Sequence, residues 1–305
     1  MTLPLALPLA WPYPPKTTCK SEPNCSLRAT TLSLSRMHSS KDKEVRRGLS
    51  TQGVRQTLSE RDEAIIRSIE NYRYMSSVQL ELLHFTDQAS QPTAARTCRR
   101  VLSRLTNLGL LWQLERRIGG VRAGSASYVY GLGALGYRIL HEGSPPRQNE
   151  PSTQFLDHTL AITGLAVDLH VEARSGSLEL LEVATEPKCW RPFSVGLEGS
   201  QTLKPDLFVS LRSGGYEYHW FIEIDLATHS AASVLRKCAI YQKYWQTGLE
   251  QDRSGVFPRV LWVTPYTRRQ ALIRRSIAAS RQLHPDLFQV CSREATVACL
   301  TGEES

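Results

Sequence analysis

The chain lacks the sequence features that mark several common protein classes. Its seven cysteines include no C-x-x-C pair, which argues against a zinc site or a disulfide framework and favours reduced thiols in a cytoplasm. No stretch reaches the ~18 consecutive apolar residues of a membrane span. Acidic residues are outnumbered, 29 against 37 Lys and Arg, and the formal net charge is +8. This excess favours a polyanionic partner, although a basic surface without such a partner is the alternative.

The length of 305 residues favours about two domains. The first 55 residues are rich in Pro, Ser, Thr and charged side chains, a composition typical of disorder. A Pro-rich stretch follows residue 142 and predicts a linker. We therefore expect five segments: a disordered segment (1–55), a DNA-binding domain (56–142), a linker (143–152), a second domain (153–292) and a C-terminal tail (293–305).

The first domain begins with a pattern of three helices. Ile65, Ile69 and Tyr72 share one helical face, and Ser76 with Gln79 has the spacing of a capping box that opens a second helix. A third helix is expected from about residue 93 to 108. Its apolar stripe lies opposite four arginines: Arg96, Arg99, Arg100 and Arg104.

After the third helix, two short strand patterns enclose a basic turn. Residues 110–114 and 128–130 alternate as strands, a helix is expected over 134–141, and three arginines lie in or beside the turn: Arg116, Arg117 and Arg122. Three helices followed by a basic hairpin predict a winged helix, whose last helix enters the major groove of duplex DNA. Between Lys41 and Arg147, seventeen Lys and Arg face ten acids. The alternative is a solvated basic face.

The second domain is organised around a predicted hairpin in which three acids are the candidate site residues. Asp206 begins the first strand, and Glu223 and Asp225 project from one face of the second, which is otherwise apolar. Buried carboxylates are costly unless they are paired or bound to a cation. Three converging acids therefore predict a site for Mg²⁺, which prefers oxygen ligands. The alternative is an edge hairpin whose acids face water.

The elements around this hairpin predict a mixed α/β domain. A helix is expected over 153–173, a strand over 178–185, a helix over 230–246, a strand over 259–264, a helix over 268–280 and a strand over 286–291. The order is α-β-β-β-α-β, a mixed sheet flanked by helices. His158 and Glu172 lie on the first of these helices, about 21 Å apart along its axis, and cannot share a metal site. His158 is interpreted as an ordinary packed or capped histidine.

The pattern Pro205-Asp206 followed after sixteen residues by Glu223-Ile224-Asp225 resembles the PD-(D/E)xK nuclease superfamily. The resemblance implies a restriction-endonuclease-like fold, with Mg²⁺ held by Asp206, Glu223 and Asp225. The chain departs from the pattern at Asp225, which stands where the superfamily has Lys. Lys237, in the following helix, is then the candidate catalytic lysine.

Three phrases add a narrower resemblance: Asp157-His158-Thr159-Leu160, Lys204-Pro205-Asp206 and Glu223-Ile224-Asp225-Leu226-Ala227-Thr228. Together they resemble the replication-relaxation family of bacterial plasmids and integrative elements, over about residues 58–292. The resemblance implies a cytoplasmic protein that binds double-stranded DNA, with a homodimer among its expected assemblies. A Mg²⁺-dependent nicking enzyme is one alternative, and a non-catalytic replication or transcription regulator with a degenerate nuclease fold is the other.

Overall fold

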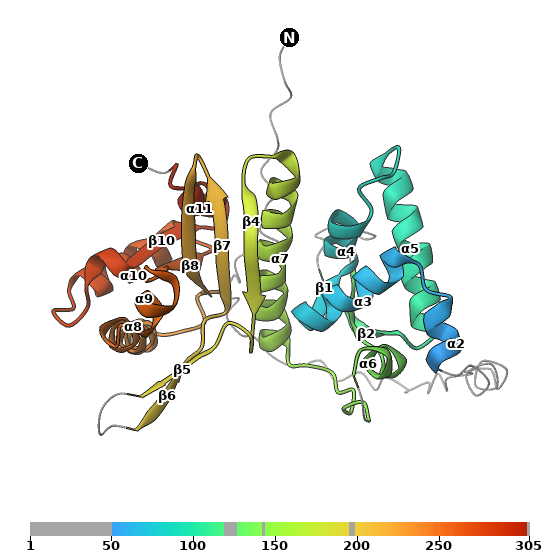
Figure 1. The fold of residues 1–305 in the computed structure, drawn as a ribbon, viewed down its shortest axis with the longest axis horizontal. Helices are drawn as coiled ribbons and strands as arrows, with labels where there is room; N and C mark the ends of the chain where they lie inside the picture. Colours follow the sequence, from blue (N-terminus) through green and yellow to red (C-terminus); the bar gives the residue numbers. More distant parts are fainter. Residues whose placement is uncertain (1–50, 119–126, 142–143, 195–198, 304–305) are drawn as a thin grey trace, which may run out of the picture.

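The computed structural model describes residues 51–118, 127–141, 144–194 and 199–303, with the side chains of 115–118 left out (Figure 1). Most of the segment expected to be disordered, residues 1–50, lies outside this range. Its last residues are helical: α2 (Thr51–Gln56) buries Val54 in the first hydrophobic core. The chain is a mixed α/β protein, as the sequence predicts.

The first two predicted helices form with the expected caps. In α3 (Glu60–Tyr72), Ser59 and Asp62 make a reciprocal capping box, and the apolar face buries Ile65 and Ile69. The predicted capping box of Ser76 and Gln79 opens α4 (Ser77–His84). Each box satisfies backbone N–H groups that have no partner inside the helix.

The third helix, α5 (Gln91–Asn107), lies in the chain between the first and second strands of a three-stranded sheet. Its strands are β1 (Tyr74–Ser76), β2 (Leu111–Ile118) and β3 (Ser127–Leu132), in the order β1-β3-β2. Strand β1 was not predicted, because three residues are too few to show an alternating pattern. Helix α6 (Ala134–Leu140) closes this half.

A five-stranded sheet forms the centre of the second half. Its order is β10-β9-β8-β7-β4, with β4 (Glu179–Thr185), β7 (Leu207–Ser213) and β8 (Tyr216–Ile224) antiparallel. Strands β9 (Arg259–Thr264) and β10 (Phe288–Ser292) continue it in parallel with β8. The expected α-β-β-β-α-β order is observed in α7, β4, β7, β8, α8 and β9.

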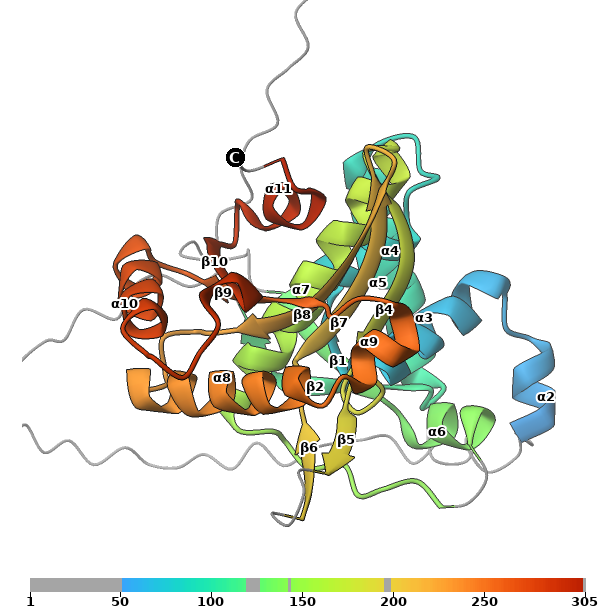
Figure 2. The ribbon, with the colours of Figure 1, turned by 60° about the vertical axis from the view of Figure 1, so that its left-hand side comes forward.

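Helices cover both faces of this sheet (Figure 2). Trp220, Ile222 and Ile224 pack with residues of α7 (Thr153–Ser175) and α11 (Thr296–Thr301). Phe221, on the opposite face, packs with residues of α8 (Ala231–Gln246) and α10 (Thr267–Ala278). The alternation predicted for β8 is thus confirmed, and it directs Glu223 toward the α8 side.

Several short elements were not predicted. Strands β5 (Arg191–Ser194) and β6 (Ser200–Leu203) pair outside the main sheet, and α9 (Leu249–Ser254) and the 3₁₀ helix η2 (Pro285–Leu287) lie in connections. Helix α11 occupies the segment expected to be a tail. It is ordered because Cys299 and Leu300 are buried against the sheet.

Helix α7 packs against both halves of the molecule (Figure 1). Ala166 and Val167 belong to the core of the first half, whereas Leu165 and Leu169 belong to the sheet core. Thr163 Oγ1 also donates a hydrogen bond to the carbonyl of Tyr74 at 3.2 Å. The helix therefore joins the two predicted domains. Among the described helices, none is both long and apolar enough to cross a membrane.

Candidate functional site

Two of the three predicted acids meet where β7 begins and β8 ends. Leu207 pairs with Ile222 in the β7–β8 register, which sets Asp206 beside Glu223. The Asp206 amide donates to the Ile222 carbonyl at 3.2 Å, and Asp206 Oδ2 accepts a hydrogen bond from the Ile224 amide at 2.8 Å. Both acids are buried, with 7% and 1% of their surfaces exposed. Backbone pairing therefore determines where the first carboxylate lies.

Lys237 reaches both carboxylates from α8. Its Nζ forms a salt bridge with Glu223 Oε2 and lies 3.8 Å from Asp206 Oδ1. One helical turn later, Tyr241 donates a hydrogen bond from its hydroxyl to Glu223 Oε1 at 2.5 Å. The i, i+4 spacing of Lys237 and Tyr241 places both side chains on the helix face that covers β8. The two oxygens of Glu223 thus have different partners.

His158 completes this cluster from α7. Its Nε2 lies 3.3 Å from Asp206 Oδ1, and 30% of its side chain is exposed. The sequence interpretation of His158 as a packed histidine did not place it here. Its only sequence signal was the phrase Asp157-His158-Thr159-Leu160, since nothing in the spacing connects it with Asp206. Glu172, at the other end of α7, accepts hydrogen bonds from Ser177 and takes no part.

The electrostatics of the cluster follow from burial opposed by close charges. Burial raises the pKa of Glu223 to about 8, against the opposing effect of the Lys237 ammonium. Burial also acts to raise the pKa of Asp206, but Lys237 and His158 outweigh it and the net shift is downward. For Lys237 and His158, burial would lower the pKa, but the adjacent carboxylates raise both pKa values. The arrangement therefore favours an anionic Asp206 beside a cationic Lys237.

The third predicted acid, Asp225, has different partners from those of the cluster. Its Oδ2 is 2.5 Å from Arg269 Nε of α10, and its Oδ1 accepts a hydrogen bond from the Ala227 amide at 3.0 Å. Ala227 has a left-handed φ of 61°, which is uncommon for a residue with a side chain. Arg269 also donates to the His229 carbonyl at 2.7 Å. Both oxygens of Asp225 are thus engaged in holding the β8–α8 connection.

The donor set can be compared with what Mg²⁺ requires. Mg²⁺ in proteins is held by one or two carboxylates and keeps several waters. Asp206 and Glu223 supply two carboxylates that converge on one point, now filled by Lys237 Nζ. Within the described ranges, no three His, Cys, Asp or Glu side chains form a group that could hold a metal ion. Asp206 and Glu223 are therefore the two carboxylates that could hold Mg²⁺, whereas Asp225 is engaged with Arg269.

The predicted DNA-binding arginines separate into three groups. Arg96, Arg99 and Arg100 are exposed on α5, and none of them forms a salt bridge within the described part of the chain. Arg104 instead lies 2.5 Å from Oδ1 of Asp62, the acid of the α3 capping box. Arg116 and Arg117 lie in β2, but their side chains are outside the described set, as is the whole of Arg122.

These features define a mixed α/β protein with a carboxylate–lysine cluster at the end of a central hairpin. A family model described as replication-relaxation matches residues 66–260. The match spans more than half of the chain and includes α5 and every residue of the cluster. The chain belongs to the replication-relaxation family. No curated protein and no solved structure matches it.

Proposed function

We propose that the protein binds double-stranded DNA of a plasmid or mobile element and acts on the DNA backbone during replication or relaxation. The observation that carries this proposal is the cluster of Asp206, Glu223, Lys237 and His158. Strongly perturbed titratable groups of this kind concentrate at functional sites. Membership of the replication-relaxation family supports a role in replication or relaxation. The basic face of α5 supports double-stranded DNA as the binding partner.

The first half supports DNA binding through its topology and its charge. The order α3-β1-α4-α5-β2-β3, with the sheet order β1-β3-β2, is the order expected of a winged helix and supports this part of the proposal. In such a fold, α5 is the helix that enters the major groove. Arg96, Arg99 and Arg100 lie on its exposed side, where they would neutralise phosphates and release counterions. We propose that this face of α5 binds the duplex.

The second half supports chemistry on a phosphodiester, as a PD-(D/E)xK-like domain would. Asp206 and Glu223 are held by β7, β8 and Tyr241, so neither carboxylate must reorganise when a substrate arrives. Lys237 Nζ, which lies against both carboxylates, would give up this position to Mg²⁺, and its ammonium would then stabilise negative charge developing on the phosphate. Mg²⁺, when bound by the two carboxylates, would supply Lewis-acid activation of water and phosphate oxygens.

Nicking of supercoiled plasmid DNA tests this proposal. The wild-type protein should convert supercoiled to open-circular DNA in Mg²⁺ or Mn²⁺, and Asp206→Asn and Lys237→Ala should each reduce the rate by at least about tenfold. Glu217→Gln is the control, because Glu217 is an exposed acid on the same strand as Glu223. Thermal unfolding should show stabilisation by the metal in the wild type and in the control, but much less in Asp206→Asn.

A second candidate is a non-catalytic regulator with the same fold. The salt bridges of Lys237 favour it, because the ammonium already neutralises the carboxylates that a metal would need. This candidate predicts specific duplex binding with neither nicking nor stabilisation by metal. Stabilisation without nicking would indicate a site that retains its cation but does not catalyse.

A further inference from the structure

A turn beside the carboxylate cluster presents two lysines and a tryptophan. Lys188, Trp190 and Lys204 lie on the two chain segments that flank the β5–β6 hairpin. Lys188 and Lys204 are exposed and Trp190 is half-buried. The Lys204 ammonium lies 4.3 Å from the centre of the Trp190 ring, and Lys188 Nζ donates a hydrogen bond to Asn71 Oδ1 at 3.1 Å. The two lysines and the tryptophan are called the Trp190 surface below.

The Trp190 surface adjoins the cluster through both of its segments. Lys204 precedes Asp206 by only two residues. Cys189, between Lys188 and Trp190, is fully buried, and its Sγ donates a hydrogen bond to the Pro205 carbonyl at 3.0 Å. That contact fastens the turn to the backbone directly before Asp206.

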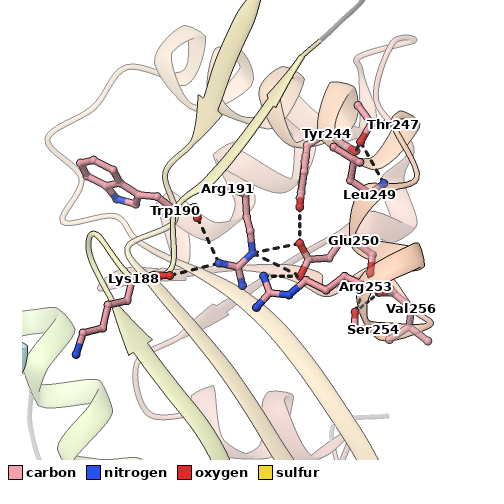
Figure 3. Close-up of polar contacts among 10 residues, drawn as sticks. All are labelled: Lys188, Trp190, Arg191, Tyr244, Thr247, Leu249, Glu250, Arg253, Ser254 and Val256. Atoms are coloured by element: carbon pink, nitrogen blue, oxygen red, sulfur yellow. Dashed lines mark hydrogen bonds and ion pairs between the residues drawn. The ribbon is translucent and has the colours of Figure 1, made fainter.

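A buried arginine sets the shape of the turn (Figure 3). Arg191 Nη1 donates to the carbonyls of Lys188 and Trp190, both at 3.4 Å. Its Nε lies 3.2 Å from Glu250 Oε2, and Tyr244 donates a hydrogen bond to the same oxygen. Figure 3 shows the Lys188 and Trp190 side chains projecting to the side away from Glu250. The network therefore fixes the backbone of the turn that carries these two side chains, with Lys188 exposed and Trp190 half-buried against the hydrophobic core on the α8 side of the sheet.

We propose that the Trp190 surface binds single-stranded DNA and leads an unpaired strand to Asp206. The inference rests on the proposed function, because it takes the cluster as the place where the DNA backbone is bound. An aromatic ring beside lysines is the combination used for single strands, in which bases stack on the ring and the cations contact phosphates. In a duplex the bases are already stacked on one another, so Trp190 would gain little from it.

Binding of a fluorescently labelled single-stranded oligonucleotide by the full-length protein, followed by anisotropy in EDTA, tests the inference. Trp190→Ala should weaken single-strand binding about tenfold, because a base–aromatic stack contributes roughly 1–3 kcal/mol. Trp190→Phe should retain most of the affinity, since it keeps an aromatic ring. Duplex of the same sequence should bind the wild type and both variants equally.

Lys204→Ala provides a test that leaves the hydrophobic core untouched. It should weaken single-strand binding and lower the slope of log affinity against log salt by about 0.7, the value for one phosphate contact. Arg281→Ala is the charge-matched control, because Arg281 is exposed and forms no salt bridge within the described residues. It should leave both the affinity and the slope unchanged.

The outcomes separate this inference from the proposed function. Unchanged single-strand affinity in Trp190→Ala and Lys204→Ala, with duplex binding intact, would overturn the Trp190 surface alone. Equal reductions in affinity for single strand and duplex would also overturn it, because they would indicate a general phosphate contact. A wild-type protein that binds neither form of DNA would overturn the proposed function and this inference together.

Discussion

The two halves of the molecule place their charges in opposite ways. In the first half, Arg96, Arg99 and Arg100 stand on the surface of α5 without salt bridges in the described structure. In the second half, the three candidate site acids lie in the interior, each against a cationic partner: Asp206 and Glu223 with Lys237, and Asp225 with Arg269. The first half is therefore suited to binding a polyanion, and the second to holding charge in a dry site.

This difference has a physical consequence for how the halves respond to mutation. A buried charge is tolerated only when it is paired and hydrogen-bonded, so removal of one partner leaves an uncompensated charge in the interior. A surface charge that forms no pair can be removed at little cost to folding. Mutations of the buried, paired charges of the second half should therefore reduce stability, whereas mutations of the exposed, unpaired arginines of α5 should reduce DNA affinity.

The largest expected effect concerns whether the two halves remain associated after the chain between them is cut. The sequence predicts a linker at 143–152, and residues 144–152 lie in neither helix nor strand. Limited proteolysis should cut there, but the two pieces should elute together in size-exclusion chromatography, because α7 contributes Ala166 and Val167 to the first core. Separate elution of two folded pieces would show instead that the two predicted domains fold independently on either side of the linker.

The second prediction concerns the buried pair of the second half. Arg269→Ala should lower the free energy of unfolding by about 3–5 kcal/mol, because it leaves Asp225 buried without its cation. Urea denaturation measures the change. Adding Asp225→Asn to this variant should recover part of the stability, since a neutral amide needs no counter-ion. A decrease below about 1 kcal/mol would show that water reaches Asp225 and that the interior is less dry than its burial indicates.

The acidic hairpin shows how far the sequence could predict the second half. The strand pattern correctly predicted that Glu223 projects from one face of β8, because the side-chain period of a strand is fixed at two, and Trp220 lies on the opposite face. The sequence also predicts that Asp225 converges with the other two acids, but in the structure Asp225 is paired with Arg269. Residues 223 and 225 share a face, but Arg269, 44 residues further along, engages Asp225. Which cation meets which carboxylate depends on helix packing, which periodicity does not contain.

The same limit applies to α7 and α5. The amphipathic pattern predicted both helices, yet the partner of His158 lies beside a strand that begins 49 residues later, a contact that only the fold creates. Arg104 belongs by its spacing to the arginine face of α5, but its contact with Asp62 depends on where α3 lies relative to α5. Helix periodicity gives the face of a residue, whereas its partner depends on tertiary structure.

The third prediction uses a half-buried histidine of the first half, His84, which hydrogen-bonds with Ser68. Burial, together with the nearby Arg174, Arg61 and His170, lowers its pKa from 6.5 to about 4. Between these two values the unfolded chain binds a proton that the folded protein does not, so His84 makes stability fall as the pH decreases from about 6.5 to 4.

Replacement of His84 isolates this contribution. His84→Gln should flatten the decrease in unfolding free energy over that pH range by about 2 kcal/mol, after allowance for partial exposure. His284→Gln is the control, because His284 is half-exposed. Parallel pH profiles for the wild type and His84→Gln would mean that His84 is hydrated and that the first half does not exclude charge from its core.

The smallest expected effect on stability distinguishes Arg104 of α5 from the exposed arginines of the same helix. Arg104→Ala should lower the unfolding free energy by about 1–2 kcal/mol, because the buried Asp62 would be deprived of a charge-assisted hydrogen bond. Arg96→Ala with Arg100→Ala should change stability by less than about 0.5 kcal/mol. The same double variant should weaken duplex binding and reduce the slope of log affinity against log salt by about 0.9 for each phosphate that is no longer neutralised.

If Arg104→Ala instead weakened duplex binding as strongly at unchanged stability, the salt bridge to Asp62 would have to open in the complex. Arg104 would then join the binding face of α5 that its helical spacing predicts.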